Sequence, residues 1–356
     1  MASEITSSFA FNREELKDWS KVINELTFGD PTLNELHDIE QGIKYNQQIV
    51  FAGRMGLMGK TVTGCNPNAV AGVALTEKTW TPVDMDFRLE HCSADVNAQD
   101  KLIRQMSKMN PDFYNVIEGS NSVVGNFLVA KVVEGFNENL IRQTWFSDTA
   151  AALTSGGGVF KVGTDLGFFN SYNGFFKQIF TEIPTTDAKY VAIAKNAGAS
   201  YAAQALASGE AIATLKAMYA KADSRLLDSG SAKFYVTRSI WDGYLNDLES
   251  IQNSGAGNTM INENGQVSLT YRGIPVVKIE VWDRVIAAYQ DNGTKWNLPH
   301  RAVLSTPMNL KIGTLATDDF GALDAFYDQY HKVNVIDGVY TIDAKHLEKY
   351  MTVAAY

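Results

Sequence analysis

A long run of apolar residues at helical spacing is the feature that most constrains how this chain can fold. Between Asn121 and Trp145 apolar side chains recur every three or four positions: Val124, Phe127, Leu128, Val132, Phe136 and Leu140. This spacing places them on one face of an α-helix, and such a face is buried against another part of the protein. The sequence therefore predicts a long amphipathic helix as the central element of the fold.

A stretch upstream has the alternation of a strand with one apolar face. Apolar side chains alternate here with charged ones: Val83, Met85, Phe87 and Leu89 with Asp84, Asp86, Arg88 and Glu90. Successive side chains of a strand point to opposite faces, so this period of two predicts one buried and one polar face. Together with the glycine-rich segment that begins at Ile49, it predicts a long two-stranded excursion over residues 49–91.

Two further helices are expected from their spacing and their end signals. Residues 96–109 carry apolar side chains on one helical face. Pro111 is expected to end this helix, because proline disfavours helical geometry in the residue before it. Residues 209–227 show the same periodicity, with Ser208 as the expected N-cap and Gly230 just beyond the end.

Strand and turn signals dominate the second half of the chain. KFYVT at 233–237 is typical of a strand, and Ser239 is expected to cap the helix after it. Three dipeptides that favour tight turns lie between apolar runs: Asn264-Gly265, Asn292-Gly293 and Asp337-Gly338. Both positions of such dipeptides tolerate a positive φ, so each predicts an antiparallel hairpin. Helices and antiparallel strands together predict an α+β fold.

The composition is that of a folded globular protein. Hydrophobic residues make up 45% and charged residues 20% of the 356 positions, which argues against a disordered or fibrous chain. A chain of this length exceeds one compact domain, so we expect two or three packed units or one elaborated fold. The formal charge of −9 argues against a surface that grips nucleic acid through its phosphates.

The sequence contains no apolar stretch that predicts export or a membrane span. Acidic residues interrupt the opening segment, and the longest apolar stretches contain charges. Cys65 and Cys92 are too few for a disulfide framework and are consistent with a reducing cytoplasm, although one bridge between them stays open.

Two segments superficially resemble catalytic motifs. GRMGLMGKT at 53–61 contains the lysine and threonine of a phosphate-binding loop, but Arg54 stands where the first glycine is needed. We therefore interpret its glycines as loop flexibility. GASYA places Ser200 between a strand-like and a helix-like stretch, as in an imperfect nucleophile elbow. A serine hydrolase would also need partners such as His300 or His331, and this remains the alternative from another functional class.

The candidates for metal ligands are sparse. Cys65 and the His91-Cys92 pair do not have the spacing of a zinc site. Asp84 and Asp86 share one face of the predicted strand and could approach a cation, but a solvated polar face is the commoner reason for such a pair. We expect no catalytic residue, no cofactor and no metal site.

Several stretches in the second half of the chain resemble a known family. They are VSLTYRGIPVVKIEVWD at 267–283, HRAVLSTPMNLKIG at 300–313 and the closing segment KVNVIDGVYTIDAK at 332–345. Together with the strand at 233–237 and the order of the elements upstream, they resemble the major capsid proteins of tailed bacteriophages, which have the Hong Kong 97-type fold. The resemblance extends over nearly the whole chain and rests on the order and spacing of short motifs.

The resemblance implies an α+β fold with a set order of parts. An N-terminal arm would comprise residues 1–48, and an extended two-stranded loop would comprise residues 49–92. A peripheral domain with the long spine helix would comprise residues 93–148 and 311–356. An axial domain would comprise residues 149–310.

The same resemblance implies a structural protein and not an enzyme. Copies of the chain would form the hexamers and pentamers of an icosahedral head, the capsid of the virion, which encloses double-stranded DNA without sequence-specific binding. Portal and scaffolding proteins are expected partners, decoration proteins are further candidates, and assembly is expected in the host bacterial cytoplasm. Because the chain starts at Met1 with an arm-like segment, we expect a separate scaffolding protein. An encapsulin-like compartment shell is the alternative with the same fold.

The arm and the extended loop are expected to make the contacts between copies. A strand pair in a protruding loop cannot bury an apolar face in its own subunit, so it favours a neighbour. The candidate interface residues are Arg54, Lys60, Trp80, Phe87 and Arg88. Some capsids of this family join subunits by Lys–Asn isopeptide bonds, for which Lys60 and Lys78 would be the lysines in the loop.

Overall fold

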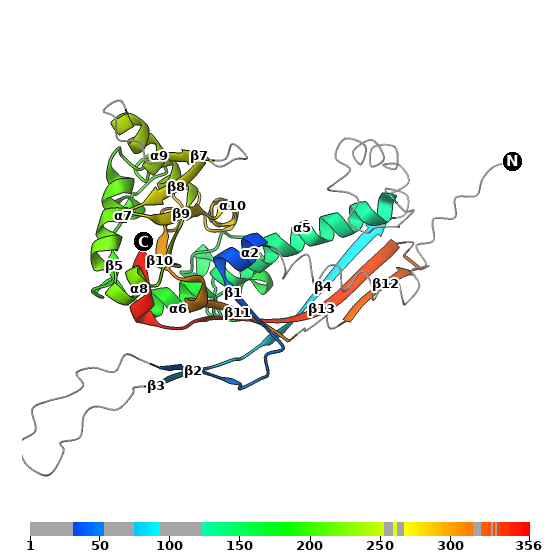
Figure 1. Cartoon of the computed structure of the whole chain (residues 1–356). Coiled ribbons are helices and arrows are strands. Elements are labelled where there is room, and N and C mark those ends of the chain that lie inside the picture. The colour runs from blue at the N-terminus through cyan, green and yellow to red at the C-terminus, as the bar shows by residue number, and fades with distance from the viewer. Residues whose placement is uncertain are drawn as a thin grey trace, which may run out of the picture.

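The computed structural model describes residues 31–52, 75–92, 123–252, 259–261, 267–315, 322–328, 330–331 and 333–356. In Figure 1 a rounded body lies at the left, a helix and long strands extend from it to the right, and a two-stranded ribbon extends below it. The extended helix is α5 (Val123–Phe146), and the long strands beside it are β4 (Val83–Cys92) and β13 (Val333–His346). The ribbon consists of β2 (Gln48–Ala52) and β3 (Leu75–Thr79).

A seven-stranded mixed sheet forms the centre of the body. Its strands follow the order β5-β14-β10-β6-β9-β8-β7. Their bounds are β5 (Tyr190–Val191), β14 (Val353–Ala355), β10 (Ala302–Ser305), β6 (Lys233–Val236), β9 (Ile274–Lys278), β8 (Val267–Tyr271) and β7 (Thr259–Ile261). β5 pairs with β14 and β6 with β9 in parallel, and the other neighbours are antiparallel.

This sheet separates two hydrophobic clusters. Tyr235 and Val303 belong to the first cluster, whereas Phe234 and Leu304 belong to the second, as the alternation of side chains along a strand requires. Helices cover both faces. The first cluster includes residues of α5, α6 (Phe175–Glu182) and α10 (Glu280–Tyr289), and the second includes residues of α7 (Glu210–Lys221), α8 (Ser224–Asp228) and α9 (Arg238–Gln252).

A five-stranded sheet connects the body to the extended part. Its strands follow the order β1-β11-β13-β12, and β4 also pairs with β13. The remaining bounds are β1 (Asp38–Gln41), β11 (Leu310–Thr314) and β12 (Ala322–Asp328). The first part of β13 lies between β4 and β12, and its last part pairs with β11. β13 therefore runs from the extended part back into the body.

The alternation predicted for residues 83–90 is confirmed. The charged side chains of β4 are exposed, and its apolar side chains pack against the first cluster. Phe87 meets the ring of Phe136 on α5 edge to face at 4.7 Å, and Tyr340 of β13 lies 5.2 Å from the same ring. The expectation that this strand belongs to a two-stranded excursion is wrong, because β4 pairs with β13 and buries its apolar face within its own chain.

The long helix α5 is also confirmed, and its C-terminal end enters the body. The ring of Trp145 lies 4.5 Å from that of Trp282 on α10 and 5.0 Å from that of Phe175 on α6. Phe176 contacts Trp282 in turn, at 4.7 Å. The first hydrophobic cluster therefore continues across the domain boundary expected at residues 148 and 149.

The hairpin expected at Asp337-Gly338 is wrong. Both residues lie inside β13, which continues to His346. Gly338 is opposite Phe87 of β4 and Leu323 of β12, so the strand is paired on both sides at this point. Two flanking ladders of backbone hydrogen bonds hold the dipeptide extended, although its local preference is for a turn.

The hairpins predicted at the other two turn dipeptides, Asn264-Gly265 and Asn292-Gly293, have different outcomes. β7 and β8 pair antiparallel, which confirms the hairpin around Asn264-Gly265, although the turn itself lies outside the described residues. Asn292-Gly293 does form a tight turn, in which Gly293 has a φ of 86°. It follows helix α10, however, and is flanked by one isolated bridge, between Asp291 and Trp296, in place of the paired strands predicted there.

The helix predicted up to residue 227 is divided into α7 and α8. Gly209, with a φ of 85°, precedes α7 as its N-cap, and Ser208 instead hydrogen-bonds to Asp247 at 3.1 Å. Asp223 accepts a hydrogen bond from the backbone N–H of Arg225 and so caps α8. The new cap starts a second helix, which a continuous apolar period does not reveal.

The strand predicted at KFYVT is confirmed as β6, and Gly230 before it has the left-handed φ of 69° that suits a helix end. α9 begins at Arg238, so Ser239 lies in its first turn and is not its N-cap. The Ser239 hydroxyl contacts Nδ1 of His300 at 2.7 Å. The helix predicted at 96–109 lies outside the described residues.

Part of the segment predicted as an arm belongs to the body. α2 (Pro31–Leu36) is followed by β1, which pairs in parallel with β11, and the side chains of Leu33 and Ile43 are buried. Short 3-10 helices complete the description: η1 (Thr154–Gly156), η2 (Leu166–Phe168), η3 (Ala194–Ala197), η4 (Pro307–Asn309) and η5 (Lys349–Met351). Among the helices of the described stretches, none has the length and apolar character to cross a membrane.

Candidate assembly surfaces and the base of the ribbon

The ribbon of β2 and β3 projects away from the body (Figure 1). Gln48 pairs with Thr79 at one end of the ladder, and Ala52 pairs with Leu75 at the other. Among the described strands, β2 and β3 pair only with each other. An isolated two-stranded ribbon is at best marginally stable in water, and its free edges can pair with another chain. The ribbon is therefore the described element with the strongest structural need for a partner.

A buried tryptophan attaches the ribbon to the body. Trp80 directly follows β3 and has no exposed surface. It lies against Gly313 of β11, where an added Cβ would come within 2.9 Å of the Trp80 ring and 2.7 Å of Ile43. The next residue, Thr81, donates its backbone N–H to the buried carboxylate of Asp343 at 2.7 Å. The ribbon thus starts from a firmly packed base.

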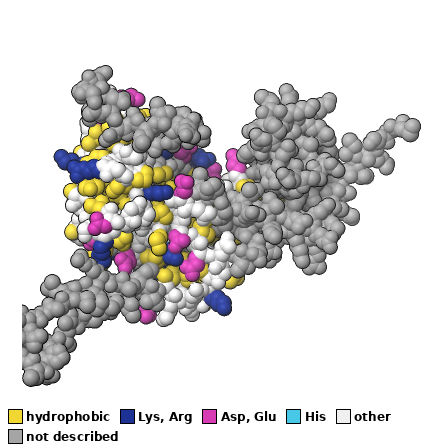
Figure 2. All heavy atoms as spheres, viewed as in Figure 1, with side chains coloured by type: hydrophobic (Ala, Val, Ile, Leu, Met, Phe, Trp, Pro, Cys, Tyr) yellow, Lys and Arg dark blue, Asp and Glu magenta, His cyan; other side chains and the backbone are white. Residues whose placement is uncertain are grey.

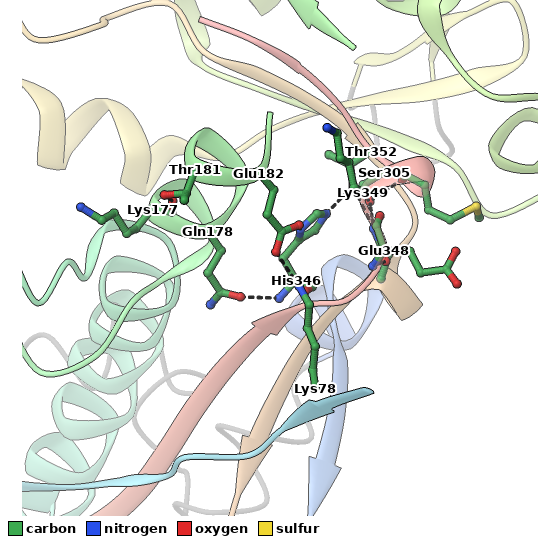
Figure 3. A network of polar contacts seen from close by, with 12 residues as sticks. Lys78, Lys177, Gln178, Thr181, Glu182, Ser305, His346, Glu348, Lys349 and Thr352 are labelled. Atoms are coloured by element: carbon green, nitrogen blue, oxygen red, sulfur yellow. Dashed lines mark hydrogen bonds and ion pairs between the residues drawn. The ribbon is translucent and has the colours of Figure 1, made fainter. Parts of the chain in front are cut away.

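A polar network adds a second attachment at this base (Figure 3). The ammonium of Lys78, on β3, lies 2.6 Å from a carboxylate oxygen of Glu182 at the end of α6. The same ammonium donates to the backbone carbonyl of His346 at 2.5 Å. Lys78 therefore connects the ribbon with both a helix and a strand of the body.

The network continues inward through a fully buried histidine. His346 Nδ1 donates to the second carboxylate oxygen of Glu182 at 2.8 Å, and its Nε2 accepts from the Thr352 hydroxyl at 2.8 Å. Asn309 donates to Thr352 Oγ1 at 2.8 Å, and Gln178 accepts from the backbone N–H of His346 at 2.9 Å. Each of these groups has a hydrogen-bond partner, which favours one arrangement of the network.

Burial and neighbouring charged groups shift the pKa values of His346 and Glu182 in opposite directions. Burial lowers the pKa of His346 below its ordinary value, and the hydrogen bond and charge of Glu182 offset this only in part. Burial alone would raise the pKa of Glu182, but contacts with His346 and Lys78 outweigh it and hold this pKa below its ordinary value. At neutral pH the arrangement is therefore a neutral imidazole beside a carboxylate that pairs with Lys78.

The interface residues expected from the sequence lie in different surroundings. Arg54 and Lys60 lie outside the described residues. Trp80 is fully buried and Phe87 packs on Phe136, so both stabilise the subunit itself. Of the three candidates that the structure describes, Arg88 is the exposed one, with half of its side chain accessible, and it pairs with Glu90 on the same strand at 2.8 Å.

Lys78 is held by its partners in the network. As a candidate for an isopeptide bond it would first have to leave Glu182 and the His346 carbonyl. Three quarters of its side chain is already buried, with 24% exposed. Sequence reasoning placed Lys78 in the loop but missed its partners, because Glu182 and His346 lie far from it in the chain.

The elements of a serine hydrolase are not brought together. Ser200 is exposed, and its hydroxyl accepts from the backbone N–H of Ala203 at 3.3 Å. His300 is engaged through Nδ1 with Ser239 and through Nε2 with the carbonyl of Gln204. His331, the other proposed partner, pairs with Asp328. The described contacts therefore give Ser200 no histidine.

The remaining candidates for chemistry have structural partners or lie outside the described residues. Asp84 accepts from the Thr341 hydroxyl at 2.6 Å across the β4–β13 pair. No group of three or more potential metal ligands occurs within the described part of the chain. The segment at 53–61 and Cys65 fall outside it.

Large exposed apolar side chains are dispersed over the described surface. On the face of the body shown in Figure 2, hydrophobic side chains lie among charged ones. Tyr330, beside the turn between β12 and β13, is 89% exposed, compared with 69% for Met308 and 58% for Tyr350. Tyr330 thus projects from the extended part, as the ribbon projects from the body.

Comparison with known proteins rests on structure alone. No protein-family model matches the sequence, and no curated protein matches it. The structure, however, aligns with a chain of the satellite phage P4 procapsid, which includes the size determination (Sid) protein, at a TM-score of 0.55 and 9% identity. The alignment covers 94% of this chain and 96% of that one. This chain has a phage capsid fold.

A second phage structure aligns over a similar share of the chain. A chain of Gordonia phage Cozz aligns at a TM-score of 0.51 and 9% identity, over 91% of this chain and 85% of that one. Both alignments extend over almost the full length, so the capsid fold includes the body as well as the extended part. At such low identity the agreement concerns the arrangement of the backbone.

Proposed function

We propose that this protein is the major capsid protein of a tailed bacteriophage. Its copies form the hexamers and pentamers of an icosahedral head that encloses double-stranded DNA. One observation carries the proposal: a capsid fold over 94% of the chain is combined with a ribbon whose described strands have no partner strand in the body. A neighbouring copy supplies the surface that such a ribbon lacks.

The parts of the molecule suit a Hong Kong 97-type organisation. α5 with β4, β12 and β13 would form the spine helix and sheet of a peripheral domain, because these elements extend side by side (Figure 1). The seven-stranded sheet with its helices would form the axial domain. The ribbon would be the extended loop, and its described strands cover residues 48–52 and 75–79, a smaller part of the chain than the 49–92 expected from the sequence.

The role is mechanical and involves no catalysis. The DNA is enclosed and not gripped, which the formal charge of −9 supports. Portal and scaffolding proteins are proposed partners, with decoration proteins as further ones, and assembly takes place in the host cytoplasm. Arg88, Arg54 and Lys60 are the proposed contact residues, of which Arg88 has the exposure that a contact needs.

Shortening the segment between β2 and β3 tests the proposal. Residues 53–74 are replaced by Asn-Gly, because Ala52 and Leu75 are paired and a two-residue turn can join them. We expect the free energy of unfolding to change by no more than about 1 kcal/mol, since the closure entropy of a connecting segment depends only weakly on its length. Closed particles, seen for the unaltered chain by negative-stain electron microscopy, should be lost.

The outcomes are distinct. Closed particles from the shortened chain would show that the ribbon is not the assembly element. A chain of full length that stays monomeric at high concentration would overturn the capsid role itself. Particles that contain a co-purifying enzyme in place of nuclease-protected DNA would favour a compartment shell.

A further inference from the structure

The ribbon and the buried histidine share one carboxylate. Glu182 uses Oε1 for Lys78 of the ribbon and Oε2 for Nδ1 of His346, at 2.6 and 2.8 Å (Figure 3). Lys78 also binds the carbonyl of His346 itself. The charge on His346 therefore acts directly on the contact that attaches the ribbon.

His346 is neutral in the geometry observed. Glu182 can only accept a hydrogen bond, so Nδ1 carries the proton, and the Thr352 hydroxyl donates to Nε2. A second proton on Nε2 requires the Thr352 hydroxyl to turn away. Ser305, whose hydroxyl lies 3.0 Å from Thr352 Oγ1, offers an acceptor for it. The buried side of the network can therefore take up the proton.

The added positive charge also acts on the ribbon side of the network. An imidazolium beside Glu182 competes with Lys78 for the same carboxylate, and it lies close enough to Lys78 for the two cations to repel each other. A charged histidine with no exposed surface is also costly to bury, which favours any movement that admits water. Both effects weaken the hold of the body on Lys78.

We propose that Lys78, Glu182 and His346 form an acid-sensitive latch: protonation of His346 releases Lys78 and loosens the ribbon from the body. The latch belongs to the single chain, whereas its use in regulating contacts between copies rests on the proposed capsid function. Histidine is suited to this role because it changes its charge in mild acid, and burial moves this change in His346 to a lower pH than usual.

The surroundings of His346 contain few competing charges. Glu182 from α6 and Lys78 from β3 are the charged groups that act on it. β11 presents Leu310 opposite His346, and the neutral Thr352 lies before β14. Asp343 and Lys345 alternate to the other face of β13, where they pair with each other at 3.2 Å. On α6, Lys177 pairs with Asp148 at 3.0 Å.

Hydrogen–deuterium exchange of the unassembled chain tests the latch. Exchange is measured at about pH 7.5 and about pH 4, because burial lowers the pKa of His346 below the usual value of histidine, and it is corrected for the intrinsic rate. In the unaltered chain we expect peptides of β3 to exchange several-fold faster at the lower pH, while those of α7 in the body stay protected.

Three substitutions separate the latch from a general effect of acid. His346→Gln keeps hydrogen-bonding capacity without a titratable ring, so β3 should exchange at the same rate at both pH values. Lys78→Gln lacks the ribbon contact and does not disturb the core, so β3 should exchange fast at both. His331→Gln, at an exposed histidine on the turn after β12, is the matched control and should keep the pH dependence of the unaltered chain.

A pH dependence that persists in His346→Gln or in Lys78→Gln would overturn the latch. Exchange of β3 that is equal at both pH values in the unaltered chain would overturn it as well. Neither result depends on particle formation, so the latch can fail while the capsid role stands. Conversely, a chain that shows the latch but forms no particles would overturn the capsid role alone.

Discussion

The body and the ribbon are built from the same chain but are stabilised in different ways. The body places apolar residues on both faces of a seven-stranded sheet, and its largest aromatic side chains lie in contact with one another. The ribbon is a single pair of short strands joined to the body by Trp80 and the Lys78 network. The body is therefore stabilised by its own packing, whereas the described strands of the ribbon pair only with each other.

Because of this difference, substitutions in the two regions should affect the stability of the subunit and its assembly separately. A substitution in the body changes the free energy of unfolding because it removes packing that the subunit alone provides. Under the proposed capsid role, a change in the ribbon is expected to leave that free energy almost unaltered and to act on contacts between copies. The base of the ribbon, where both regions meet, should show intermediate behaviour.

The largest effect is expected for Trp282→Ala in the body. Trp282 has no exposed surface and packs against Trp145 and Phe176. Truncating a buried tryptophan leaves a cavity and should lower the free energy of unfolding by about 3 to 5 kcal/mol. Urea denaturation followed by circular dichroism measures the change.

Tyr330→Ala is the control for Trp282→Ala. Tyr330 is 89% exposed, so its truncation should alter the free energy of unfolding by no more than about 0.5 kcal/mol. Equal losses for the two variants would contradict the distinction between the packed body and the projecting parts.

An intermediate effect is expected for Gly313→Ala at the base of the ribbon. The added methyl group would lie 2.7 Å from Ile43 and 2.9 Å from Trp80, both fully buried. Such overpacking should cost about 1 to 3 kcal/mol in the free energy of unfolding. Because Trp80 is displaced, β3 should also exchange its amide hydrogens faster, which mass spectrometry can follow.

Gly135→Ala provides the matched control for Gly313→Ala. A Cβ at this position of α5 meets nothing within 4 Å. Alanine is better than glycine within a helix by about 0.5 to 1 kcal/mol, so this variant should be more stable than the unaltered chain. A loss of stability in both variants would show that close contact at Gly313 is not the cause.

The smallest effect is expected for Asp283→Asn on α10, and it depends on pH. Burial raises the pKa of Asp283 to about 6. The hydrogen bond that its carboxylate accepts from the backbone N–H of Arg238, at 2.8 Å, acts against this shift. The folded state therefore holds the proton more tightly than the unfolded state, and stability is lost as pH rises from about 4 to about 6. Asparagine has no carboxyl group to titrate, so the Asp283→Asn variant does not show this loss of stability.

Urea titrations at several pH values measure the effect of Asp283→Asn. The variant should gain stability relative to the unaltered chain as the pH rises through this range. Glu249→Gln, at an exposed position of α9, is the control and should show no such trend. A difference that is constant across pH would contradict the raised pKa of Asp283.

Local patterns in the sequence were sufficient for several elements. The apolar period of residues 121–145 predicted α5, and the alternation in 83–90 predicted both faces of β4. These patterns succeed because the helix and the strand each bury one face, and burial selects side chains at a fixed spacing. The order of short motifs also led to the capsid fold that the structural comparison supports.

What the sequence left open concerns partners that lie far apart in the chain. The alternation of apolar and charged residues in β4 is compatible with pairing either to the ribbon or to β13. The dipeptide Asp337-Gly338 favours a turn, but pairing with two flanking strands keeps it extended. Glu182 is separated by more than a hundred residues from both Lys78 and His346, and neither spacing nor propensity joins them. The sequence by itself thus determined the long helix α5 and the apolar face of β4. Only the tertiary structure decided which faces meet, because pairing and ion contacts depend on distances in space that a local pattern does not contain.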